Sequence, residues 1–174
     1  IEVFQGTYDD VTYWLKNGVV DLGFLSTSSA KDIPIEPLWR DPLLCIVPKG
    51  MKKEKDTDYM DIGEIRNHQF VTQRESTDAD IQNFLKENSI NIQSNYHVVD
   101  DLSTVAMVAN GFGICLMPEM VMKDIPYEVD CFPVKPDACR IIGIAALNPD
   151  NMAPAVRTFY NRVLAMYQQE EYVK

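Results

Sequence analysis

Polar side chains gather in this sequence at three places where an apolar, strand-like run ends. Ser26 to Ser29 are four hydroxyl residues after the run Val19 to Leu25. Thr72-Gln73-Arg74 and Asp100-Asp101 close two later runs. Ligands of open α/β sheets bind outside the carboxyl ends of the strands. These groups therefore suit non-covalent binding of a small polar molecule, and Arg74 suits recognition of a carboxylate.

Each of these groups also has a purely structural interpretation. Ser and Thr are common after strands, where they bond to nearby backbone, and composition alone favours that role for Ser26 to Ser29. Helix capping accounts for one residue of Ser76-Thr77. Arg74 could equally be a solvated surface charge. Two of the three strand ends precede helix starts, however, where free backbone N–H groups can hold an anion.

The elements around these groups alternate between strand and helix patterns, which predicts the α/β class. Ile1 to Phe4 has strand composition, and Thr7 can cap a helix that stops at Asn17-Gly18. The run Val19 to Leu25 follows and is apolar nearly throughout, which suits a strand covered on both faces of a parallel sheet. The first unit is therefore predicted as strand, helix, strand.

The rest of the chain continues this alternation after a loop at Pro34 and Pro37. Strands are predicted at Leu43 to Val47, Phe70 to Thr72, Tyr96 to Val99, Gly113 to Met117 and Ile141 to Leu147. Helices are predicted after the capping residues Asp61, Thr77 and Asp100, and an amphipathic helix from Pro154.

Signs of catalysis and of metal binding are nearly absent from the sequence. Known nucleophile, zinc-protease, phosphate-loop and dinucleotide motifs do not occur. Cys45 and Cys115 lie inside apolar runs and are interpreted as buried thiols. Cys131 and Cys139 could form a disulfide or half a metal site, but metal sites need denser clusters. We therefore expect no metal, no cofactor and no enzyme activity.

Charge and hydropathy limit the partners of the chain. Its formal net charge is −10, so it should bind neither DNA nor anionic membrane surfaces by itself. No run reaches the roughly 18 apolar residues of a membrane span. The chain lacks an initiator Met and a signal peptide and begins in mid-pattern, which is typical of a fragment. A cytoplasmic location is expected.

Four segments, in this order, resemble a known family. They are VVDLGFL, PLWRDPLLCIVPKG, VAMVANGFGICLMPEMV and APAVRTFYNRVLAM. Together they are similar to the effector-binding domain of LysR-type transcriptional regulators, and the resemblance covers essentially the whole chain. The most specific piece is VANGFGICLMP, which combines a helix end, a tight turn and a strand ending at Pro118.

The resemblance implies the two-lobed fold of type 2 periplasmic binding proteins. Lobe I would comprise residues 1–45 and 145–174, and lobe II residues 46–144. The chain would cross between the lobes near Leu43 to Pro48 and near Arg140 to Ala146. In the family a further strand and helix of lobe I come before the IEVF segment, and they are missing from this chain.

The resemblance also implies a function and a set of site residues. Such domains sense a small molecule, often an anionic metabolite, in the interlobe cleft. They control a winged helix-turn-helix that is absent here and bind DNA only through it, as homodimers or tetramers. A solute-binding protein of a transport system is the alternative. The implied ligand-binding residues are Leu25, Ser26, Thr27, Thr72, Gln73, Arg74, Ser76, Thr77, Asp100 and Asp101.

Overall fold

A computed structural model describes residues 1–73, 79–92, 94, 96–98 and 100–168 of the chain. The chain forms two compact units. Unit 1 is Ile1–Arg40 with Arg140–Lys174, and unit 2 is Asp41–Cys139. Strand β2 (Ile35–Pro48) leads from unit 1 into unit 2, and β8 (Cys139–Ala145) leads back. The lobe boundaries predicted from the sequence fall inside the same two strands.

Unit 1 begins with a helix whose first turn is fixed by its own side chains. The hydroxyl of Thr7 accepts the backbone N–H of Asp10 at 3.2 Å, and the Asp10 carboxylate accepts the N–H of Thr7 at 2.9 Å. This reciprocal pair confirms the predicted start of α1 (Tyr8–Lys16). The helix ends at Asn17, and Gly18 takes the left-handed conformation with φ +67°.

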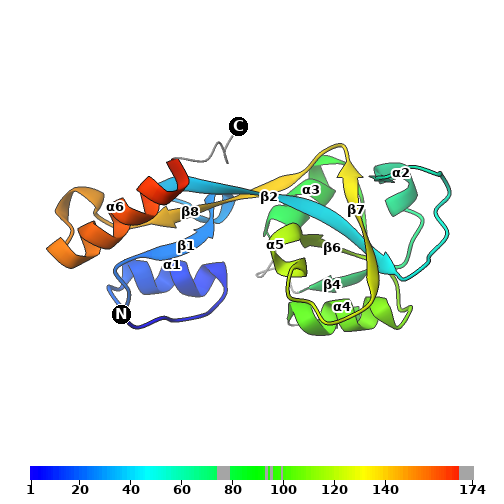
Figure 1. Ribbon diagram of the computed structural model, residues 1–174, viewed down its shortest axis with the longest axis horizontal. Coiled ribbons are helices and arrows are strands. Elements are labelled where there is room, and N and C mark those ends of the chain that lie inside the picture. Colours follow the sequence, from blue (N-terminus) through cyan, green and yellow to red (C-terminus); the bar gives the residue numbers. More distant parts are fainter. Residues whose placement is uncertain (74–78, 93, 95, 99, 169–174) are drawn as a thin grey trace. The chain divides into compact units, whose positions relative to one another are not determined.

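Helix α1 packs against the short strand β1 (Gly23–Ser26), as Figure 1 shows. A side chain at Gly23 would collide with Val11 and Leu15, so this glycine allows the close approach. Leu15 and Leu25 lie in the small core of the unit together with Ala30, Ile33 and Ala145. The remaining elements of unit 1 are the 3₁₀ turns η1 (Thr27–Ser29) and η2 (Pro149–Asn151) and helix α6 (Pro154–Gln168).

Two predictions about the start of unit 1 are wrong. Ile1 to Phe4 form no strand, and Ile1 and Val3 are exposed. The run Val19 to Leu25 contributes only its last three residues to β1, which pairs antiparallel with β8 rather than within a parallel sheet. Phe24 is 49% exposed, so the strand is covered on one face only. A strand requires a hydrogen-bonded neighbouring strand, and residues 1–4 form no strand pairing with the described part of the chain.

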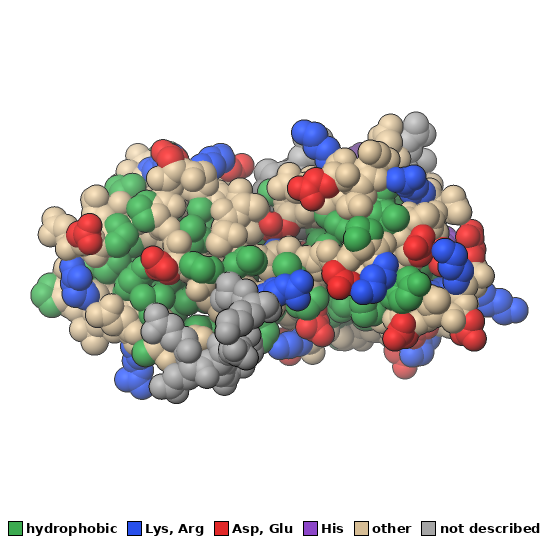
Figure 2. All heavy atoms as spheres, turned by 90° about the horizontal axis from the view of Figure 1, so that it is seen from above, with side chains coloured by type: hydrophobic (Ala, Val, Ile, Leu, Met, Phe, Trp, Pro, Cys, Tyr) green, Lys and Arg blue, Asp and Glu red, His purple; other side chains and the backbone are tan. Residues whose placement is uncertain are grey.

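Helix α6 starts at the predicted Pro154, but its apolar face is only partly covered. Val156, Val163 and Leu164 are half-buried, and Phe159 is exposed. Figure 2 shows hydrophobic side chains on the surface of unit 1, at the end where Figure 1 draws α6. The apolar periodicity therefore identifies the helix without reporting how deeply it is buried.

Unit 2 is built around the second half of β2. Residues Leu43 to Ile46 pair antiparallel with β6 (Cys115–Pro118), and Leu44 to Pro48 pair antiparallel with β7 (Val129–Lys135). The predicted loop at Pro37 is wrong, because β2 already begins at Ile35. The other elements are β3 (Met60–Asp61), α2 (Ile62–Ile65), β4 (Val71–Gln73), α3 (Ala79–Glu87), β5 (Tyr96–Val98), α4 (Asp101–Ala109) and α5 (Glu119–Met122).

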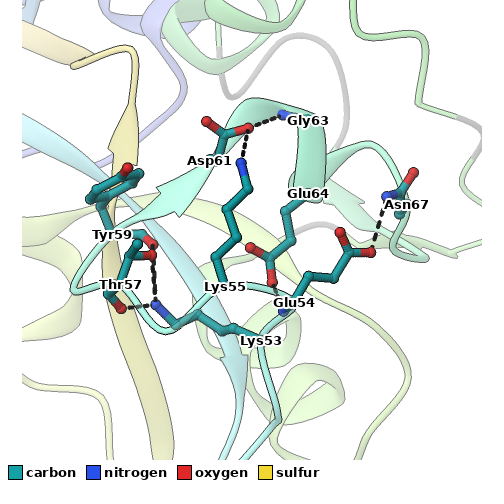
Figure 3. A network of polar contacts seen from close by, with 9 residues as sticks. All are labelled: Lys53, Glu54, Lys55, Thr57, Tyr59, Asp61, Gly63, Glu64 and Asn67. Carbon is teal, nitrogen blue, oxygen red and sulfur yellow. Dashed lines mark hydrogen bonds and ion pairs between the residues drawn. The ribbon is translucent and has the colours of Figure 1, made fainter.

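A buried carboxylate holds the charged loop after β2 against unit 2. Glu64 is 2% exposed, and its Oε1 accepts the backbone N–H of Glu54 at 2.5 Å. The ammonium of Lys53 donates to the backbone carbonyls of Thr57 and Tyr59, as Figure 3 shows. These bonds fix the backbone of the loop, while most of its charged side chains stay exposed.

Candidate functional site

The hydroxyl residues after β1 take different roles in unit 1. Ser26 is fully buried, and its Oγ lies 3.1 Å from that of Ser28. Leu25 is also fully buried, and Thr27 opens the turn η1. The Ser29 hydroxyl is buried without a hydrogen-bond partner among the described residues. The three predicted residues of unit 1, Leu25 to Thr27, thus lie at the carboxyl end of β1.

A cation that the site prediction did not include lies at the same end of β1. Arg140 lies on β8, two residues before Ile142, which pairs with Ser26. Its Nη1 donates to the hydroxyl of Tyr8, the first residue of α1, at 3.2 Å. In the sequence, Arg140 stands out only as an arginine at the start of the apolar run Ile141 to Ala145. That position does not show which residues lie near Arg140 in the fold.

In unit 2 the predicted residues Thr72 and Gln73 lie at the carboxyl end of a small parallel sheet. Strands β4 and β5 pair in parallel, with Gln73 opposite Val98. The hydroxyl of Thr72 donates to the carbonyl of Tyr96 at 3.1 Å and lies 3.2 Å from Nδ1 of His97. Thr72 thus joins the two strands one residue before Gln73, where β4 ends.

The start of α4 lies shortly after the end of β5. Asp100 caps this helix, and its carboxylate accepts the backbone N–H of Ser103 at 2.8 Å. These bonds from Ser103 lower the pKa of Asp100. The hydroxyl of Thr104 donates to the backbone carbonyl of Asp100 at 2.8 Å, and Asp101 is the first helical residue. The capping role predicted for Asp100 is confirmed.

The structure therefore groups the described candidates by unit. Leu25, Ser26 and Thr27 belong to unit 1, and Thr72, Gln73, Asp100 and Asp101 belong to unit 2. The predicted contacts at Arg74, Ser76 and Thr77 lie outside the described residues, as does the predicted cap at Thr77. The contact of each candidate with a ligand stays a prediction.

Replacement of Asp100 tests its capping role at the start of α4. At pH 7 we expect Asp100→Ala to lower the free energy of unfolding by about 1 kcal/mol, whereas Asp100→Asn keeps the cap and the stability. Because the folded-state pKa of Asp100 is lowered, its contribution is complete above the unfolded pKa of roughly 4 and is lost as the pH falls through the folded value. Urea unfolding at pH 7 and pH 3 measures this, and equal stability of the two variants at pH 7 would contradict it.

One pocket of unit 2 lies away from these candidates. Its volume is about 350 Å³, and His68, Phe70 and Ile90 are among its lining residues. Phe70 directly precedes β4, so the pocket lies at the amino end of that strand. The predicted residues Thr72 and Gln73 are the last two residues of β4, at the opposite, carboxyl end of that strand. The pocket is therefore not the predicted site.

The cysteines and acidic residues of the described part of the chain give no metal site. No group of three or more His, Cys, Asp or Glu side chains there could hold an ion. Cys45 and Cys115 are buried free thiols, as predicted. Burial raises the pKa of the Cys45 thiol, which keeps it protonated and unreactive. Within the same described residues, no helix combines the length and hydropathy needed to span a bilayer.

Comparison with known proteins agrees with this architecture. The family model of the LysR substrate binding domain matches residues 1–168. The chain belongs to this family. A LysR substrate-binding domain is a domain of transcriptional regulators rather than of enzymes, and its fold is that of the type 2 periplasmic binding proteins, as predicted.

Two curated relatives of this LysR domain are themselves regulators. It is 22% identical to the uncharacterized HTH-type transcriptional regulator YoaU of Bacillus subtilis (strain 168) over 164 residues, and 24% identical to the probable HTH-type transcriptional regulator LrrA of Synechococcus elongatus over 161 residues. Each match covers 91% of this chain and 54% of the relative, so the chain spans about half the length of these relatives.

Solved structures share the fold of this LysR domain. The effector-binding domain of QuiR in complex with shikimate superimposes with a TM-score of 0.83 at 22% identity, covering 97% of this chain and 82% of that one. The regulatory domain of CcmR from Synechocystis PCC6803, in complex with 2-PG, gives 0.80 at 15% identity and covers 93% and 80%. At such identities the likeness establishes the fold alone.

Proposed function

We propose that this chain is the ligand-sensing domain of a LysR-type transcriptional regulator. A small molecule that it binds changes how an attached winged helix-turn-helix domain engages DNA. The match of the family model over residues 1–168 carries the proposal. The complexes of the QuiR and CcmR domains with shikimate and 2-PG show that related folds hold small molecules.

The ligand contacts are proposed at the carboxyl ends of the strands. Ser26 and Thr27 in unit 1, and Thr72, Gln73 and Asp101 in unit 2, are the described residues that we propose as contacts, together with Leu25 and Asp100. Arg74, Ser76 and Thr77 complete the proposed set. Hydroxyl and amide groups at strand ends can donate to and accept from a small polar ligand.

The remaining proposals concern the whole protein. It acts without catalysis, in the cytoplasm, as a homodimer or tetramer. It binds DNA only through a domain other than this chain, because a net charge of −10 opposes phosphate contacts.

DNA binding by the full-length protein tests the proposed function. We expect the full-length protein to shift duplex DNA from the region upstream of its own gene, and the 174-residue chain alone to cause no shift. We also expect a pool of small acid metabolites to alter the footprint or affinity of the full-length protein. A full-length protein that binds no DNA, or a salt-sensitive shift by the isolated chain, would refute the proposal.

A further inference from the structure

A pocket at the amino end of β4 lies apart from the proposed ligand contacts. Its volume is about 350 Å³, and two chain segments line it. Residues 66–70 lead from α2 into β4, and residues 90–92 follow α3 on the way to β5. All of these lining residues belong to unit 2, so the pocket requires nothing of the placement of unit 1.

One wall of the pocket is apolar. Phe70 and Ile90 line it, and both are buried in the large hydrophobic core of unit 2. Ile92 also lines the pocket, and it is half-buried and packs against the same core. Because the core holds these side chains, the wall is formed before a ligand arrives. Such a wall suits the hydrocarbon part of a small molecule.

A fixed cation lines the same pocket. Arg66 follows α2 directly, and its Nη2 donates to the backbone carbonyl of Asn88 at 2.6 Å. This bond holds the guanidinium between the two segments, because Asn88 comes two residues before Ile90. A guanidinium has five N–H donors in a planar fork, so further donors of Arg66 can bind a carboxylate.

The charge of Arg66 is not neutralised by a carboxylate in the described part of the chain. None of the ion pairs there includes Arg66. Glu54, from the neighbouring loop, accepts the amide N–H of Asn67 at 3.1 Å instead, as Figure 3 shows. Glu64 is buried, and its Oε1 accepts the backbone N–H of Glu54. An anion that enters the pocket would therefore meet an unpaired guanidinium.

His68 adds an unsatisfied hydrogen-bonding atom to the pocket. It is a lining residue, and its Nε2 is buried without a hydrogen-bond partner among the described residues. Buried polar atoms in proteins are nearly always paired, so this nitrogen calls for a partner from outside the chain. An imidazole nitrogen that carries a proton can donate to a carboxylate oxygen. Arg66 and His68 thus offer two kinds of donor beside one apolar wall.

We propose that this pocket binds a small carboxylic acid with an apolar body. Arg66 contacts the carboxylate through its guanidinium, and His68 turns its Nε2 toward one of the carboxylate oxygens. The hydrocarbon part lies against the apolar wall. Thr72 and Gln73, which belong to the proposed ligand contacts, lie at the other end of β4. The pocket is therefore a second binding site, and it goes beyond the proposed function.

A purely structural role is the competing explanation for Arg66. In that case its bond to Asn88 only fastens the end of α2 to the end of α3. Lys86 provides a matched control, because it is an exposed cation in the last turn of α3, two residues before Asn88. Lys86 is not among the described lining residues, so Lys86→Gln removes a nearby charge without changing the pocket.

Calorimetric titration of the full-length protein tests the inference. The probes are phenylacetate and isocaproate, each with its primary amide, and inorganic phosphate. We expect at least one acid to bind and its amide to bind at least about tenfold more weakly, because charge-assisted hydrogen bonds are the stronger ones. Arg66→Gln should weaken binding of that acid by about tenfold or more, and His68→Phe by about threefold or more. Lys86→Gln should leave it unchanged.

A second variant keeps the test decisive if Arg66→Gln does not fold. Asn91 is an exposed lining residue, so Asn91→Trp places a bulky side chain at the pocket without disturbing the core. We expect this variant to lose binding of the acid. Circular dichroism of each variant establishes that it is folded.

Several results would overturn the inference. They are unchanged affinity of Arg66→Gln, His68→Phe or Asn91→Trp, equal losses for Arg66→Gln and Lys86→Gln, and equal affinity of acid and amide. Binding of phosphate but of neither acid, or of no probe at all, would reject the ligand class. None of these results bears on whether the full-length protein binds DNA, so a failure here is distinct from a failure of the proposed function.

Discussion

Gly113→Ala should lower the free energy of unfolding by about 3 kcal/mol. Gly113 has φ +149°, a backbone conformation that residues with a side chain rarely adopt. Backbone strain of this kind costs a residue with a side chain about 1–3 kcal/mol. A Cβ there would also collide with the carbonyl oxygen of Gln69 and lie 2.9 Å from its carbonyl carbon. Both are backbone atoms, so the neighbour cannot rotate away. Urea unfolding followed by circular dichroism measures the loss.

The close approach at Gly113 has an identifiable purpose in unit 2. The N–H of Ile114 donates to the carbonyl of Gln69 at 2.9 Å, and the N–H of Val71 donates to that of Ile114 at the same distance. These bonds join the segment before β6 to the start of β4. Phe70 and Ile114 form an isolated parallel β-bridge between these segments, and both side chains are buried. A methyl group at position 113 would push the two segments apart.

Gly111→Ala is the matched control for this effect. Gly111 also has a positive φ of +80°, but a Cβ added to it would meet no atom within 4 Å. The substitution therefore adds backbone strain of about 1 kcal/mol without a collision. If the two variants lost equal stability, the close approach to Gln69 would not be the reason that glycine is needed at position 113.

Helix ends could be predicted from the sequence because their signals are local. Thr7 and Asp100 cap α1 and α4 with bonds to residues three positions away, so type and spacing are visible in the sequence itself. The amphipathic repeat after Pro154 likewise identified α6. The polar ends of β1 and β4, at Ser26 and Gln73, were predictable in the same way, because each comes directly after an apolar run in the sequence.

Pairing between distant segments could not be predicted in this way. Ile1 to Phe4 have strand composition but no partner, and strand propensity depends on such partners. Arg140 escaped the site prediction for the same reason, because it and Tyr8 are 132 positions apart. Sequence reasoning placed Ser28 among ordinary loop residues, yet its hydroxyl contacts that of Ser26. The partners of a site residue depend on tertiary contacts that local patterns do not encode.

Leu25→Ala should lower the free energy of unfolding by about 3 kcal/mol, within the range measured for Leu to Ala in protein cores. Leu25 is fully buried and packs in the small core of unit 1 with Leu15 and Ile33. Few other apolar side chains of that cluster could fill the cavity. Phe24→Ala is the control. This substitution removes a larger side chain from the same strand, but Phe24 is 49% exposed.

The two tryptophans give this prediction a specific signal. Trp14 and Trp39 both lie in unit 1, so tryptophan fluorescence during urea unfolding reports on the unit that contains Leu25. We expect a clear loss for Leu25→Ala and a loss below about 1 kcal/mol for Phe24→Ala. Equal losses would mean that burial in β1 does not determine stability there.

Leu25→Met then distinguishes packing from ligand contact at the same position. Methionine nearly conserves the volume, so the expected loss of stability is below about 1.5 kcal/mol. The Leu25 side chain is fully buried, so its proposed contact with a ligand is made by the backbone, and we expect this variant to bind a ligand as the wild type does. A large drop in affinity without loss of stability would instead assign the Leu25 side chain to the ligand site.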